Sequence, residues 1–63
     1  MPFALIHLLE GRSDEQKRAV IEKVTQALCD AVGAPAENVR VCIHDVPKAN
    51  WGIAGRAAKD LGR

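Results

Sequence analysis

Residues Pro2–Arg12 (PFALIHLLEGR) set the fold of this chain, because they predict a short strand that ends in a tight turn. Apolar side chains fill almost every position from Phe3 to Leu9, and Gly11 marks the turn that follows. Both faces of this strand are apolar, so we expect both to be covered. A single helix covers one face only, and the other face therefore needs a partner chain.

Pro2 has a structural and a functional explanation. It lacks a backbone N–H and therefore fits the first position of a strand. If Met1 is removed, however, its nitrogen becomes a secondary amine, and α-amino groups have a reference pKa of roughly 7.7–8.0. An apolar pocket and neighbouring guanidinium groups would lower the pKa of this amine, making it a general base at neutral pH. With Met1 retained, the nitrogen is an amide without useful basicity.

The composition limits the class of protein. A chain of 63 residues rarely gains more than about 3–5 kcal/mol from its own core, yet 48% of these residues are hydrophobic. We therefore expect a single domain (residues 1–63) that completes its core by oligomerising. The net charge is +1 without a basic run, and no apolar run is long enough for a bilayer, so we expect neither a nucleic-acid nor a membrane partner. No signal peptide is recognised, and Cys29 and Cys42 are interpreted as reduced thiols of a cytoplasmic protein.

A helix of about five turns is predicted after the first turn. Ser13 is a suitable N-cap, Gln16 completes a capping box, and Gly33 is a suitable C-terminal cap. Seven apolar residues recur at helical spacing, with Ile21 widening the stripe: Ala19, Val20, Val24, Ala27, Leu28, Ala31 and Val32. Arg18 lies four residues after Asp14, which predicts an ion pair on the solvated side.

A second strand is predicted at Val39–Val46, where two sets of side chains alternate between the faces. The sets are Val39, Val41 and Ile43 on one face, and Arg40, Cys42 and His44 on the other. Strand, helix and strand in this order predict a right-handed crossover with parallel strands. The glycine-rich residues 48–56 predict a hairpin that lies over a neighbouring subunit, and residues 57–61 predict one helical turn.

Several segments together resemble the 4-oxalocrotonate tautomerase family. They are Pro2, residues 9–17 (LEGRSDEQK), residues 39–41 (VRV) and residues 51–55 (WGIAG). The resemblance implies an α/β fold: a β-α-β protomer with parallel strands and a short C-terminal hairpin, assembled as a hexamer (a trimer of dimers) with sites built from more than one subunit. It also implies a cytoplasmic isomerase of aromatic hydrocarbon catabolism. This would be a keto–enol tautomerase that converts a 2-hydroxydienoate, such as the dicarboxylate 2-hydroxymuconate, to the conjugated 2-oxo isomer.

The same resemblance assigns roles to four residues. Pro2 and Arg40 would be catalytic: Pro2 as the general acid/base, and Arg40 as the group that holds the C1 carboxylate and the 2-oxygen. Arg12 would bind the far carboxylate. Trp51, where the family usually has Phe, would form an apolar wall that keeps the site dry. No cofactor or metal is implied, because enolisation beside a polarised carbonyl needs only a base and charge stabilisation.

Each of these assignments has a structural alternative. Arg12 could be a solvated turn residue. Arg40 could form a structural ion pair with Asp45 or Glu37, since charges in strands are often paired. Trp51 could serve as an oligomer contact, which is compatible with a role at an interface site.

A metal site is a further alternative, with His7, Cys42, His44 and Cys29 as ligands. Three or four such ligands must converge, and the register of the predicted helix gives Cys29 no reason to join the others. We interpret these residues as buried or interface residues.

Two functional alternatives to the tautomerase hypothesis remain. Another proline-dependent reaction on a different 2-hydroxydienoate is one, and a non-catalytic oligomeric scaffold with Met1 retained is the other. Hydrolytic dehalogenation is disfavoured, because Ile53 and Leu9 stand where relatives with that activity carry a water-activating Glu and an extra Arg.

Overall fold

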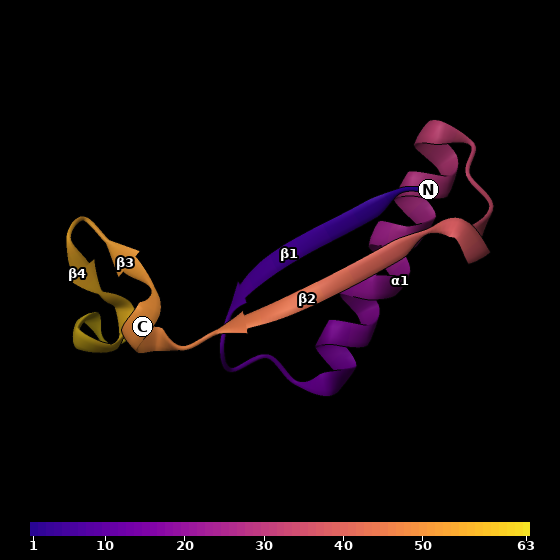
Figure 1. Cartoon of the computed structure of the whole chain (residues 1–63). Helices are drawn as coiled ribbons and strands as arrows, with labels where there is room; N and C mark the ends of the chain where they lie inside the picture. Colours follow the sequence, from indigo (N-terminus) through magenta and orange to yellow (C-terminus); the bar gives the residue numbers. More distant parts are fainter.

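A strand, a helix and a second strand form the body of the chain in a computed structural model, which describes all 63 residues. Strand β1 (Phe3–Leu9) pairs in parallel with β2 (Arg40–Val46), and helix α1 (Asp14–Val32) makes the crossover (Figure 1). A short 3₁₀ turn, η1 (Ala36–Asn38), precedes β2. The predicted β-α-β unit is confirmed.

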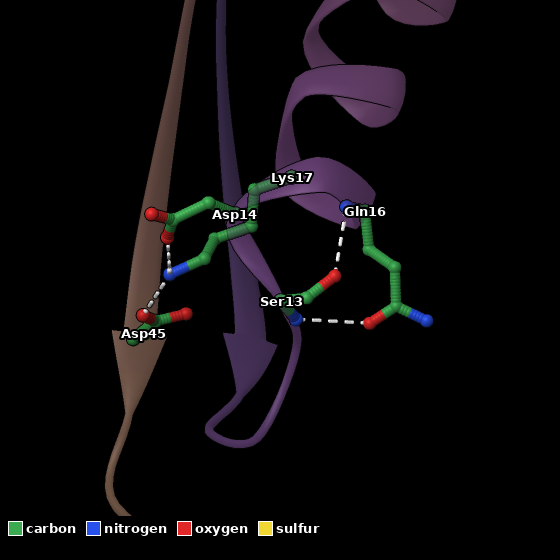
Figure 2. Close-up of polar contacts among 5 residues, drawn as sticks. All are labelled: Ser13, Asp14, Gln16, Lys17 and Asp45. Atoms are coloured by element: carbon green, nitrogen blue, oxygen red, sulfur yellow. Dashed lines mark hydrogen bonds and ion pairs between the residues drawn. The ribbon is translucent and has the colours of Figure 1, made fainter.

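The ends of α1 follow the sequence signals. The Ser13 hydroxyl accepts a hydrogen bond from the Gln16 backbone N–H at 3.1 Å, and the Gln16 side chain accepts one from the Ser13 N–H at 2.9 Å (Figure 2). At the other end Gly33 adopts a left-handed conformation with φ of 71°, and its N–H donates to the Cys29 carbonyl. The capping box and the glycine cap are therefore confirmed. The helices of this chain do not combine the length and apolar character needed to cross a membrane.

The ion pairs of α1 differ from the prediction. Lys17, not Arg18, makes them: its ammonium lies 2.7 Å from an Asp45 carboxylate oxygen and 3.9 Å from one of Asp14 (Figure 2). The hydrogen bond to Asp45 raises the pKa of Lys17 above its ordinary value, and the negative charges of Asp45 and Asp14 act in the same direction against partial desolvation. The contact joins α1 to the end of β2.

Helix α1 covers one face of the sheet and leaves the other open. On the covered face the alternate residues of both strands are at least half-buried: Ala4, Ile6, Leu8, Val41 and Ile43. On the open face Phe3 is 65% and Leu5 52% exposed. Of the predicted helix stripe, Val20, Val24 and Leu28 are half-buried, whereas the alanines remain exposed.

The shape of the protomer is that of an incomplete unit. Only Val39 and Ala58 are buried. The radius of gyration is 14.5 Å, whereas a compact chain of this length has about 11 Å. The accessible surface is 4640 Å², whereas a monomer of this mass exposes about 4,000 Å². The open apolar face and this excess surface support the expectation that a partner chain completes the core.

The C-terminal residues form a small unit that stands apart from the sheet, beyond the end of β2 (Figure 1). It begins with the 3₁₀ turn η2 (Lys48–Asn50) and continues with the antiparallel hairpin of β3 (Gly52–Ile53) and β4 (Arg56–Ala57). The turn η3 (Ala58–Leu61) follows, and its first residue, Ala58, is fully buried. The predicted hairpin and final turn are confirmed. The placement of the hairpin over a neighbouring subunit stays a prediction.

Candidate functional site

Pro2 and Arg40 meet at the end of the sheet where both strands begin. Arg40 pairs with Phe3 in the parallel register, and its backbone N–H donates a hydrogen bond of 3.0 Å to the Pro2 carbonyl. Pro2 itself is half-buried, whereas Met1 before it is 81% exposed. The sheet thus brings together the two residues predicted to be catalytic, although they are 38 positions apart in the sequence.

The guanidinium of Arg40 has backbone partners and no acidic one. Its Nη1 donates to the Glu37 carbonyl at 2.6 Å and to the Val39 carbonyl at 3.2 Å. The alternative of a structural ion pair with Asp45 or Glu37 is wrong for this protomer, because Asp45 binds Lys17 and the Glu37 contact is to the main chain. The positive charge of Arg40 is therefore not neutralised within the chain, and a carboxylate ligand can pair with it.

Arg12 lies at the opposite end of the sheet from Pro2. It is exposed in the connection between β1 and α1. The seven residues of β1 span about 23 Å at the usual rise of a parallel strand, so Pro2 and Arg12 of one protomer are much farther apart than the two carboxylates of a small dicarboxylate. One chain alone does not bring all the predicted residues to a single ligand.

Trp51 is at the same end of the protomer as Arg12. It is half-buried and directly follows η2, the turn that comes after the end of β2. The two ends of the protomer therefore carry different parts of the predicted site, with Pro2 and Arg40 at one and Arg12 and Trp51 at the other.

Glu10, a residue to which the sequence assigns no role, connects the segments that carry Arg12 and Trp51. Its backbone N–H donates to the Val46 carbonyl at 2.9 Å, and its carboxylate accepts a hydrogen bond of 2.6 Å from the backbone N–H of Lys48. The partner of this carboxylate is 38 residues away in the sequence. The local pattern Glu-Gly-Arg shows only a turn, so no sequence signal identified the contact.

The open face of the sheet carries a histidine pair. His7 and His44 are register partners, and their Nδ1 atoms lie 3.3 Å apart. Cys42 is on the same face, but Cys29 is on α1, which covers the opposite face. The structure brings no three histidine, cysteine or acidic side chains into a group that could hold a metal ion.

Comparison with known proteins gives matches over almost the whole chain. The family model described as "Tautomerase enzyme" matches residues 2–61. The 2-hydroxymuconate tautomerase of Comamonas testosteroni is 76% identical over 63 residues, and that of Pseudomonas putida is 67% identical, both covering 100% of each chain.

Solved structures give the same result. One from work on the 4-oxalocrotonate tautomerase isozymes of Methylibium petroleiphilum is 76% identical, covers 98% of this chain and 100% of its own, and has a TM-score of 0.95. One from a heterohexameric 4-oxalocrotonate tautomerase of Chloroflexus aurantiacus is 34% identical, with a TM-score of 0.92 over 97% of this chain and 98% of its own.

Proposed function

This chain belongs to the tautomerase family, and we propose on that basis that it converts 2-hydroxymuconate to the conjugated 2-oxo isomer. The observation that carries the proposal is the 76% identity to a 2-hydroxymuconate tautomerase over the full length of both chains. Because the identity is this high over the whole chain, we propose the same reaction for this protein. The chain is accordingly an isomerase.

Pro2 is the general acid/base in this proposal. After removal of Met1, its secondary amine accepts the proton of the 2-hydroxyl group, and the C2–O bond becomes a carbonyl. The C2–C3 double bond then moves to C3–C4, and the proton is returned to C5 as the C4–C5 double bond is lost. The net change moves one proton from oxygen to carbon, so no cofactor takes part.

Arginines supply the charge stabilisation. Arg40 holds the C1 carboxylate and the 2-oxygen, on which negative charge develops as the hydroxyl proton leaves. The absence of an acidic partner for its guanidinium, and the hydrogen bond between its backbone N–H and the Pro2 carbonyl, support this role. Arg12 binds the far carboxylate, and Trp51 is the apolar wall. Since Pro2 and Arg12 lie at opposite ends of one protomer, the proposal requires Arg12 and Trp51 from a different protomer than Pro2.

The working form in this proposal is a hexamer in the cytoplasm. The open apolar face of the sheet, the excess surface of the protomer and the heterohexamer found for the Chloroflexus aurantiacus relative support the assembly. The two free thiols, Cys29 and Cys42, support a reducing compartment. The proposal includes a role in aromatic hydrocarbon catabolism, which the resemblance to the family implies.

The decisive experiment combines intact mass with an ultraviolet assay of 2-hydroxymuconate. The active protein must have lost one methionine, and the wild type must isomerise the substrate much faster than Pro2→Ala or Arg40→Ala. Equal rates in all three proteins would show that the site is assigned incorrectly. A protein that keeps Met1 and lacks activity would favour the non-catalytic scaffold.

A further inference from the structure

Glu10 stands at the junction of three elements. It directly follows β1, its N–H is bonded to the last residue of β2, and its carboxylate is bonded to the first residue of η2. It is also two residues before Arg12. No other hydrogen bond or ion pair joins residues 48–63 to residues 1–46. Within one protomer, the polar contact that orients the C-terminal unit is therefore that of Glu10, together with the covalent connection through Pro47.

A short path of main-chain hydrogen bonds leads from Glu10 to Trp51. The Lys48 carbonyl accepts from the Trp51 N–H at 3.4 Å, which closes the turn that Glu10 holds at its start. The Trp51 carbonyl accepts from the Ala58 N–H at 2.7 Å, and Ala58 is fully buried. The hydrogen bond that holds Lys48 therefore also restrains Trp51, which is joined to Lys48 by a single turn.

We propose that Glu10 is a positioning residue that holds Trp51 in a fixed relation to Arg12, so that the two residues reach the partner protomer as one preformed half of the substrate site. This inference rests on the proposed function for the roles of Arg12 and Trp51. The physical basis is a hydrogen bond to a charged acceptor, which is stronger than a neutral one. Without this hydrogen bond, the C-terminal unit rotates about the Pro47 connection, and Trp51 no longer has a fixed position relative to Arg12.

Trp51 itself reports on the proposal, because it is the only tryptophan of the chain. Acrylamide quenching of its fluorescence is measured in the wild type, Glu10→Ala and Glu10→Gln, with Glu22→Ala as a control that removes an exposed carboxylate from α1. We expect the largest quenching in Glu10→Ala. Gln keeps the side-chain oxygen that accepts from Lys48 but not its charge, so Glu10→Gln should recover most of the wild-type value. Wild-type quenching in Glu10→Ala overturns the proposal.

Steady-state kinetics provide the second measurement. In Glu10→Ala we expect the KM for 2-hydroxymuconate to rise about tenfold, the effect of one lost hydrogen bond to a charged group, while kcat falls less than about threefold. Glu10→Gln recovers most of the KM. A fall in kcat with unchanged KM would contradict a positioning role. A wild type without tautomerase activity would refute the proposed function, and the quenching comparison would still decide whether Glu10 holds Trp51.

Discussion

The backbone N–H of Arg40 donates a 3.0 Å hydrogen bond to the carbonyl of Pro2, so the sheet uses the oxygen of Pro2 and does not depend on its nitrogen. Fold and proposed chemistry thus depend on different atoms of the same residue. A substitution at position 2 that keeps the carbonyl can remove the secondary amine without removing the hydrogen bond to Arg40.

The first prediction concerns this nitrogen. Pro2→Ala keeps the carbonyl but replaces the secondary amine by a primary one with a different basicity and geometry. We expect kcat for 2-hydroxymuconate to fall about 10²-fold, within the range for loss of a general base. Circular dichroism and oligomer size should be unchanged. A protein with an acylated Pro2 nitrogen that isomerises the substrate at the full rate would contradict the mechanism.

The second prediction concerns the guanidinium of Arg40. Arg40→Ala should lower kcat about 10²-fold, because a donor to the developing negative oxygen is lost. Arg40→Lys should recover part of the rate, since it restores the charge but not the two-pronged geometry. The measurement is the ultraviolet assay, with Arg18→Ala on the exposed side of α1 as the matched control. An Arg40→Ala enzyme as fast as this control would exclude Arg40 from the site.

The third prediction concerns the ion pair between Lys17 and Asp45. The pKa of Lys17 is raised in the folded state. The pair therefore stabilises the fold fully at pH values below 10.5, the ordinary pKa of lysine. The contribution is lost as the pH rises through the folded-state pKa. Urea unfolding of the wild type and Lys17→Met at fixed protein concentration should therefore differ at pH 7 and converge above pH 10.5. A difference that stays constant across this range would show that the pair does not contribute.

The fourth prediction concerns the open face of the sheet. Leu5 is 52% exposed there, and burying a lysine in its place against a partner chain is costly. Leu5→Lys should shift the assembly toward smaller species in analytical ultracentrifugation. Gln26→Lys adds the same charge beside Asp30 on exposed α1 and should leave the assembly intact. A Leu5→Lys protein of unchanged size would mean that this face is not the interface.

The sequence predicted those features that depend on neighbouring residues. The strand at Phe3–Leu9, the capping box at Ser13 and the glycine cap at Gly33 all appear as expected. Local spacing predicted an ion pair between Asp14 and Arg18, but Lys17 instead reaches Asp45 on β2, 28 residues away. Contacts of this range depend on how α1 lies against the sheet, which residue spacing does not specify.

The same reason explains which contacts at the site residue spacing alone does not show. The proximity of Pro2 and Arg40 follows from the register of a parallel pair, and the link from Glu10 to Lys48 follows from the path of the chain after β2. Neither leaves a pattern in the sequence. The apolar stripe of α1 is wider than the part of it that is buried. Two strands cover only part of the stripe, and its alanines stay exposed in the protomer.

The fifth prediction concerns the turn of the C-terminal hairpin. Ala54 and Gly55 link β3 to β4, with φ of 51° and 83°, and two such values in a two-residue loop indicate a type I′ turn. Gly55 tolerates this conformation, but Ala54 has a Cβ that makes it unfavourable by about 1 kcal/mol. Asparagine is the preferred residue at this position of the turn, so Ala54→Asn should raise the free energy of unfolding by about 0.5–1 kcal/mol. Ala54→Val should lower it, because a β-branched side chain is still less compatible with positive φ. Thermal unfolding at one protein concentration measures both changes, and an Ala54→Asn protein less stable than the wild type would mean that the hairpin adopts another turn in the assembled protein.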